Sequence, residues 1–267
     1  MSLTGKTKAG SYKDILQMNN SNSGVDATIR VVVDGEGTES AISLGDDALY
    51  IQPKNDDTTT TLRVMDTDAN PILVVDSSND LVKAGIGQHI VNTQYAYFGV
   101  NANDNSNFAT NTHYPIPFGV GGYASGSPGG FPDFGTGTDP ATTFTTAEAN
   151  SDRASDLVPV MWRVSDDITI DEIKHIEGAD TATGDTTRMH LMSYTFTSGA
   201  TSCLTSGAVV ANTSADNTNA GSEQVYLKDW TIGTSDIDAG KVLLCFFRSD
   251  SINSDYSVSV TIKYHLR

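Results

Sequence analysis

The stretch Asp255–Arg267, DYSVSVTIKYHLR, decides the fold of the C-terminal half of this chain. Ser, Thr, Lys and His alternate along it with large apolar residues. The apolar positions are Tyr256, Val258, Val260, Ile262, Tyr264 and Leu266. A period of two over eleven residues is typical of an antiparallel strand that buries one face and exposes the other.

Several stretches upstream have the same character. They are the alternating run Val158, Val160, Trp162 and Val164, then ITIDEIKHIEG, RMHLMSYTF, QVYLKDWTI and KVLLCFFRSD. The last is apolar at consecutive positions, as expected of a central strand covered on both faces. We therefore expect residues 151–267 to form an antiparallel β-sandwich head of jelly-roll type in an all-β protein. Helix should be scarce, with a turn or two at most in EIKHIEG or SYKDILQM.

The composition excludes several classes of function. The 267 residues include 33 acidic and 16 basic side chains, which gives a net charge of −17. Binding to duplex nucleic acid or to anionic membranes requires clustered Lys and Arg, so we expect neither partner. The chain also lacks a run of about 20 apolar residues that would span a membrane, and its first residues do not resemble a secretory signal.

Residues 27–92 read as short strands separated by turns at intervals of about ten residues. From Lys13 to Gln94 the only aromatic residue is Tyr50. Because aromatic rings supply much of the buried area of a core, one copy of this segment has little with which to build its own. We expect a β-rich oligomerisation stem in which several chains wind together, with a homotrimer as the simplest arrangement.

Residues 93–150 reverse this composition, since nine aromatics lie between Tyr95 and Phe134 among many glycines and prolines. We interpret the segment as a connector anchored by its rings. Tyr114 and Tyr123 are the candidate ligand-binding residues. Trp162 and Trp230 lie in expected strands and are interpreted as core.

Residues 1–26 are polar apart from a short apolar cluster of Tyr12, Ile15 and Leu16. A segment of this kind cannot fold alone, but it can dock on another surface. We expect an N-terminal arm whose three apolar side chains bind a partner protein.

No motif indicates catalysis, and we expect no cofactor. Asp66, Asp68 and Asn70 imitate the start of a calcium loop, but Pro71 stands where that loop needs glycine, so a hairpin turn explains them. The five histidines lack the spacing of zinc ligands. The carboxylate pairs Asp166–Asp167 and Asp171–Glu172 are expected by chance in so acidic a chain. Cys203 and Cys245 are interpreted as reduced thiols, although a disulfide stays possible.

Three stretches resemble virion-surface proteins of tailed bacteriophages. PILVVDSSNDLVKAGIG (71–87) is similar to segments of threefold-intertwined fibre and spike proteins. SYKDILQMNNSNSGVDATIRVVVDGEGTESAISL with ALYIQPKNDDTTTTLRVMDTDAN resembles the start of marine and cyanobacterial phage proteins, and SDYSVSVTIKYHLR the last strand of their heads. The resemblance implies a location on the virion surface and a capsid or tail protein as partner.

The sequence thus predicts a structural, non-enzymatic protein, either a homotrimeric tail fibre or a capsid-decoration protein, anchored by its N-terminus. A fibre head would contact the host surface, in particular a glycan. The alternatives are a glycan- or receptor-binding adhesin module, including a monomeric carbohydrate-binding module from a non-viral source, and a glycan hydrolase with two carboxylates across a cleft.

Overall fold

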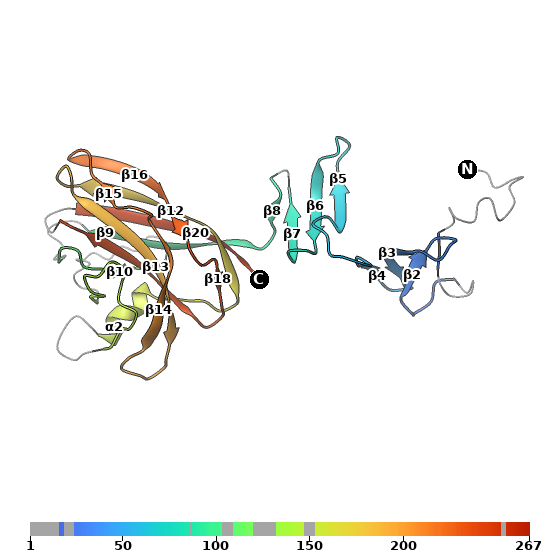
Figure 1. Ribbon diagram of the computed structural model, residues 1–267, viewed down its shortest axis with the longest axis horizontal. Helices are drawn as coiled ribbons and strands as arrows, with labels where there is room; N and C mark the ends of the chain where they lie inside the picture. The colour runs from blue at the N-terminus through green and yellow to red at the C-terminus, as the bar shows by residue number, and fades with distance from the viewer. Residues whose placement is uncertain are drawn as a thin grey trace, which may run out of the picture. The chain divides into compact units, whose positions relative to one another are not determined.

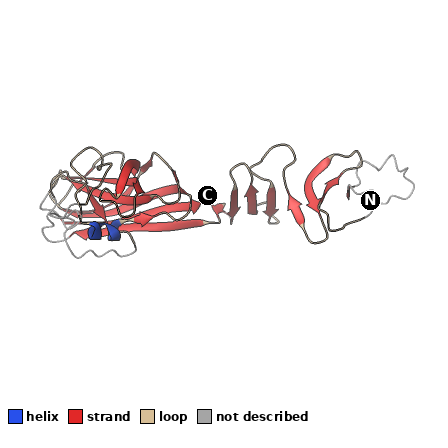
Figure 2. Cartoon of the chain, turned by 90° about the horizontal axis from the view of Figure 1, so that it is seen from below, coloured by secondary structure: helices blue, strands red, loops and turns tan. Residues whose placement is uncertain are grey.

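The computed structural model describes residues 16–18, 24–85, 87–102, 109–119, 132–146, 153–251 and 255–267. The chain divides into two compact units, residues 1–91 and 92–267. Strands dominate both units, and helix is confined, among these residues, to α2 (Ala154–Leu157) and the 3₁₀-helix η3 (Val158–Val160) (Figure 2). The expected all-β class is therefore confirmed. Neither of these two helices is long or apolar enough to cross a membrane.

The second unit is a β-sandwich of two antiparallel sheets (Figure 1). The first sheet contains, in spatial order, β16 (Glu223–Asp229), β12 (Ile168–Asp180), β20 (Asp255–Leu266) and β9 (Thr93–Ala102), with β18 (Asp236–Ile237) beside β12. The second contains β10 (Tyr114–Ile116), β19 (Val242–Ser249), β13 (Thr186–Phe196), β14 (Leu204–Asn212) and β17 (Thr231–Ile232), with β11 (Trp162–Arg163) beside β19 and β15 (Asn217–Thr218) beside β13.

The connectivity is that of a jelly roll. Its eight principal strands in chain order are β9, β10, β12, β13, β14, β16, β19 and β20. The first, eighth, third and sixth of them lie side by side in one sheet, and the second, seventh, fourth and fifth in the other. This order results when one long antiparallel hairpin folds over on itself into two sheets.

The core has two layers because β19 is apolar on both faces. Leu243, Cys245 and Phe247 face the interior between the sheets, where they meet the alternating apolar residues of β20. Leu244 and Phe246 face outward and pack under Phe134, Phe144 and Leu157 from the segment and helix that cover the second sheet. The two cysteines lie on opposite sides of this sheet, Cys245 in the inner layer and Cys203 in the outer one. Both are free thiols.

Two expectations about this unit need correction. Residues 93–150 do not merely connect, because β9 pairs with β20 along its length and β10 pairs with β19. The EIKHIEG stretch is strand and lies within β12. A bulge between Ile170 and Glu172 shifts the alternation there, so that Ile173 also faces the core. Trp162 and Trp230 are buried as expected.

The first unit contains two small antiparallel sheets. One contains β1 (Gln17–Met18), β2 (Arg30–Val33), β3 (Glu39–Leu44) and β4 (Leu49–Ile51). The other contains β5 (Leu62–Met65), β6 (Pro71–Asp76), β7 (Leu81–Ala84) and β8 (His89–Ile90).

Aspartates close the hairpins of this unit. Asp34 accepts hydrogen bonds from the backbone amides of Glu36 and Thr38, and Asp66 accepts from those of Asp68 and Asn70. The DTDAN stretch is thus a hairpin turn. The hydrogen bond from the Asn70 side-chain amide, followed by those from the backbone, lowers the pKa of Asp66, and the backbone bonds from Thr38 and Glu36 lower that of Asp34, because each stabilises the charged carboxylate.

Each sheet of the first unit has an apolar face that stays uncovered. In the second sheet, Val64 lies opposite Leu73, which lies opposite Ala84, and Leu62, Val75 and Val82 form the parallel row. None of these six side chains is buried. Ile42, Leu44, Leu49 and Ile51 form the matching face of the first sheet, and they too are unburied. Within the described part of residues 24–91, Val33 and Val74 are the buried apolar side chains.

Gly207 provides a test of how the outer core layer is packed. Its amide donates to the Thr142 carbonyl at 2.8 Å, and a Cβ at this position would lie 2.5 Å from Tyr194 Cε1 and 2.8 Å from Thr142 Cα. We expect Gly207→Ala to lower the free energy of unfolding by about 1–3 kcal/mol, because the covering segment must shift. Urea unfolding followed by tryptophan fluorescence reports on this unit.

Gly178→Ala is the matched control. Gly178 is also in the interior of a strand, but its added Cβ would meet nothing closer than 3.9 Å. This substitution should be neutral or stabilise by about 0.5–1 kcal/mol. Equal losses in the two variants would contradict the packing described for Gly207.

Candidate functional site

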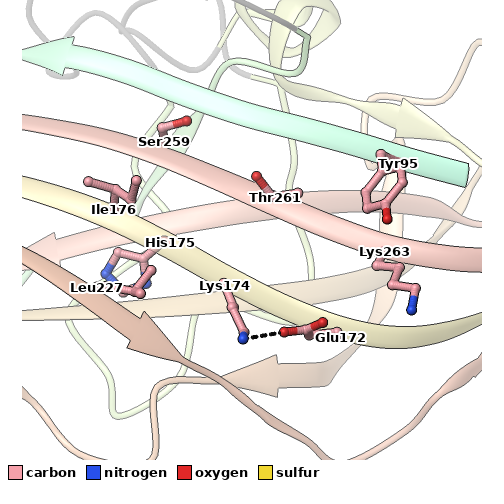
Figure 3. A pocket seen from close by; sticks show the side chains of 9 residues that line it. All are labelled: Tyr95, Glu172, Lys174, His175, Ile176, Leu227, Ser259, Thr261 and Lys263. Atoms are coloured by element: carbon pink, nitrogen blue, oxygen red, sulfur yellow. Dashed lines mark ion pairs between the residues drawn. The ribbon is translucent and has the colours of Figure 1, made fainter. Parts of the chain in front are cut away.

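A hollow on the outer face of the first sheet of the sandwich is the best-formed candidate site. It has a volume of about 270 Å³ and crosses four neighbouring strands (Figure 3). Its lining residues are Tyr95 from β9, Ser259, Thr261 and Lys263 from β20, Glu172, Lys174, His175 and Ile176 from β12, and Leu227 from β16. His175 contributes its backbone side, because its side chain is buried in the core.

The strand register explains why the surface is hollowed here. Ser259 lies between Gly99 of β9 and Ile176 of β12, and Ile176 lies opposite Leu227 of β16. The surface is low at Ser259 because its neighbour on β9 is a glycine, whereas β12 and β16 carry large apolar side chains beside it. Ile176 and Leu227 are 53% and 68% exposed and form an apolar wall. On the other side stands Tyr95, which is 54% exposed.

The charges in the hollow differ from those of the chain as a whole. Lys174 Nζ lies 2.5 Å from Glu172 Oε1 and 3.4 Å from Asp229 Oδ1. The hydrogen bond to Glu172, followed by that to Asp229, raises the pKa of Lys174. Lys263 lies opposite Tyr95 in the strand register, and its ammonium forms no ion pair with any residue that the structure describes. Lys174 is thus held in two ion pairs, whereas Lys263, which has Tyr95 opposite it on β9 and Glu172 opposite it on β12, forms none with the described residues.

A second hollow of about 420 Å³ continues along the same face. Gly178, Ser257 and Val225 line its floor and wall, and Asp180, Glu223 and Asp255 surround it. Gly178 has room for a side chain, so packing does not require glycine there. A glycine inside a strand often marks a place where a ligand approaches the backbone closely. The two hollows lie next to each other along β12 and β20, one lined by Lys174, Lys263 and Glu172 and the other by three carboxylates, and we refer to them together as the groove.

The lining of the first hollow has the components of a ligand-binding pocket. Glu172 is the one carboxylate among the residues lining the first hollow, and its ion pair with Lys174 engages it (Figure 3). An aromatic face, an apolar wall and a few polar groups are the usual components of a binding pocket.

The structure separates the residues that the sequence nominated for ligand binding. Tyr114 is 6% exposed and belongs to the inner core, so it is not available as a platform. Tyr123 lies outside the described residues, as do Tyr12 and Ile15 of the expected docking cluster. Leu16 is described and is 71% exposed. The sequence reasoning missed Tyr95, because nothing in the chain order places it beside Lys263.

Three of the four carboxylates considered for hydrolysis have polar partners in the structure. Asp167 accepts a hydrogen bond from the Ala239 amide at 2.7 Å. Asp171 lies 2.9 Å from His265 Nδ1, and Glu172 binds Lys174. These contacts hold loop and strand ends in place. Among the described residues, no three His, Cys, Asp or Glu side chains are arranged to hold a metal ion.

The sequence analysis also did not predict a network of hydrogen-bonded polar side chains inside the sandwich. Trp230 Nε1 donates to His175 Nδ1 at 2.7 Å, and His175 Nε2 lies 3.4 Å from Glu177 Oε2. Glu177 accepts further hydrogen bonds from Thr187 and Asn217. His175 and Glu177 are each 1% exposed, so a substrate has no access to them. This network provides hydrogen-bond partners for buried polar groups and joins the two sheets.

A second buried group lies on the covered face of the second sheet. The rings of His113 and His190 meet edge to face with centroids 5.0 Å apart, and both side chains are fully buried. His113 Nδ1 donates to the Gly135 carbonyl at 3.0 Å. Arg188 and Arg248 lie opposite each other on the neighbouring strands. Of the five buried side-chain atoms without a hydrogen-bond partner among the described residues, four belong to His113, His190 and Arg188.

Comparisons with known proteins leave the site unassigned. No model of a protein family matches the chain, and no curated protein shows significant similarity to it. The function therefore has to be inferred from the side chains and their arrangement.

The histidine pair makes the stability of the sandwich depend on pH. Burial, followed by the neighbouring His113 and Arg188, lowers the pKa of His190 from 6.5 to about 4, and burial likewise lowers the pKa of His113. Asp139, 3.4 Å from His190 Nε2, opposes this effect only weakly. At these pH values the two histidines are protonated in the unfolded chain but neutral in the folded chain. The free energy of unfolding should therefore fall as the pH drops from about 6.5 towards 4.

We expect a loss on the order of 1–2 kcal/mol between pH 6.5 and 5, a range above the usual titration of carboxylates. Urea unfolding at fixed pH values, followed by tryptophan fluorescence, measures it. His190→Phe should flatten the profile, whereas His89→Gln, at an exposed position of the first unit, should leave it unchanged. A wild-type profile that is level over this range would contradict the assignment.

Proposed function

We propose that this chain is a structural, non-enzymatic subunit of a tailed-phage particle, displayed on the virion surface as a homotrimeric fibre or capsid-decoration protein. In this proposal residues 27–92 form the oligomerisation stem, the residues before them dock on a capsid or tail protein, and the jelly roll is displayed. The observation that carries it is the pair of uncovered apolar faces in the first unit.

The uncovered faces argue for partners because a single chain leaves them in water. The face formed by Leu62, Val64, Leu73, Val75, Val82 and Ala84 is apolar at all six positions and none of them is buried. Burial of apolar area stabilises by roughly 25 cal/mol per Å², so covering this face is strongly favoured. Short strands with small β-branched side chains suit a narrow shared core, and identical chains bring identical faces to it.

The jelly roll is compatible with this role. It occurs among viral capsid and lectin domains, although fold analogy alone does not assign function. The groove on its outer face favours a second candidate, a non-enzymatic adhesin that binds a host glycan or receptor. The two candidates are compatible if the stem displays the head.

Solution mass tests the stem. Light scattering on the full chain should give a species near three times 28.3 kDa that persists on dilution. Val82→Asp places a charge on the uncovered face at a side chain that is 42% exposed, so each chain should still fold, but the oligomer should dissociate into monomers.

Ile72→Asp is the matched control, because Ile72 is 52% exposed on the opposite face of the same sheet. This variant should keep the wild-type mass. A monomeric wild type, or a Val82→Asp protein that keeps the full oligomer mass, would refute the stem.

Deletion of residues 1–16 tests the docking arm. It removes Tyr12, Ile15 and Leu16 but retains β1, which pairs with β2. We expect a soluble oligomer that no longer enters particles, measured as copies per purified virion by quantitative mass spectrometry. Hundreds of wild-type copies would favour decoration, and a dozen or fewer would favour a fibre. Normal incorporation of the truncated chain would rule out docking through this cluster.

A further inference from the structure

We infer that the groove on the outer face of the jelly roll binds a glycan whose terminal sugar carries one anionic group, with the anion at Lys263, the sugar ring against Tyr95 and neutral sugars towards Gly178. The inference rests on the adhesin candidate and names the class of ligand for that site.

The charge distribution identifies the anionic end. The chain carries 33 acidic and 16 basic side chains, whereas the first hollow has two lysines in its lining, with Glu172 in the lining and Asp229 beside it. Lys174 is neutralised by Glu172 and Asp229 on either side. Lys263 has no such ion pair among the described residues, and its strand places it beside the hollow (Figure 3). An anionic substituent therefore gains most by binding at Lys263.

The neighbouring side chains favour a sugar as the carrier of that anion. Tyr95 lies opposite Lys263 and presents half of its surface to solvent. The C–H face of a pyranose stacks on such a ring, since the aromatic face is apolar and carries partial negative charge. The hydroxyls of Ser259 and Thr261 lie on the floor and suit the hydroxyls of a sugar. A volume of about 270 Å³ accommodates one sugar ring.

The second hollow restricts the sugars that can be linked to the terminal one. It continues the groove over Gly178 and Ser257, where the backbone is accessible to further sugar rings. Asp180, Glu223 and Asp255 make this end acidic. A uniformly anionic polymer would meet repulsion here, whereas a neutral chain with one terminal acidic sugar would not. The groove therefore discriminates by the position of the charge as well as by its sign.

Binding of defined oligosaccharides to the full-length protein tests the proposal. The probes are 3′-sialyllactose, which carries a carboxylate, 3′-sulfolactose, which carries a sulfate, lactose as the neutral analogue, and a heparin oligosaccharide as a polyanion. By calorimetry or ligand-observed NMR, at least one singly charged probe should bind ten-fold or more tightly than lactose and than heparin. The comparison of the first two probes identifies the anion.

Point variants locate the site. Lys263→Gln and Tyr95→Ala should each lower the affinity for the preferred probe at least ten-fold. Lys54→Gln removes the same charge from an exposed lysine of the first unit and should leave the affinity unchanged. Added salt should weaken binding to the wild type and have little effect on Lys263→Gln.

The proposal is overturned if no acidic probe binds, if lactose binds equally well, or if Lys263→Gln retains full affinity. It is also overturned if Leu227→Asp lowers the oligomer mass, because the groove would then be an interface between copies. Light scattering on the same samples separates this result from the stem: a wild-type oligomer without glycan binding refutes the groove alone, and a monomer that binds glycan refutes the stem alone.

Discussion

The architecture of the sandwich depends on the burial of β19, a central strand that is apolar on both faces. One face requires the opposite sheet, and the chain supplies it with β20 and its neighbours. The other face requires a cover, which Phe134, Phe144 and the short helix supply. Phe134 and Phe144, which lie between β10 and β12 in the chain, are therefore part of the sandwich and not a tether. They form the lid of a second core layer, and the close approach of Thr142 to Gly207 shows how tightly that lid lies.

The first unit does not bury its apolar faces within one chain, and the proposed function rests on this difference between the two units. Its hairpins are locally complete, since aspartates close the turns and Asp76 binds Lys83 and Asn79. Local hydrogen bonds fix the register of short strands, but they contribute little without a covered apolar face. The sandwich satisfies its burial requirement within one chain. The described residues of the first unit leave in-register rows of Val, Leu and Ile exposed or half-buried, and we propose that association with further copies covers them.

The sequence was sufficient for features that depend on local pattern. Alternation predicted β20, the doubly apolar run predicted a central β19, and the turn residues predicted the hairpins of the first unit. The sequence was insufficient where the local pattern of residues does not determine whether a side chain is buried. The bulge after Ile170 shifts the alternation of inward and outward side chains in β12. His175 and Glu177 are polar, as expected of solvent-facing positions, but they are buried. Tyr114 and Tyr95 have similar local sequence contexts, yet pairing buries the first and exposes the second. Nothing in the chain order predicts that β9 lies beside β20, so neither the groove nor the availability of Lys263 was predictable.

The groove also shows why the side chains on this face can be exchanged without a large loss of stability. In β9, in β20 and in β12 beyond its bulge, buried residues alternate with residues that face solvent, so the two sets are chemically independent. Val258, Val260 and Ile262 hold β20 in the core, whereas Ser257, Ser259 and Thr261 between them only shape the surface. Outward side chains can therefore be exchanged at little cost in folding energy. A protein that displays its head on a particle surface gains from this arrangement, since specificity can be altered on one sheet face while the stem and core stay unchanged.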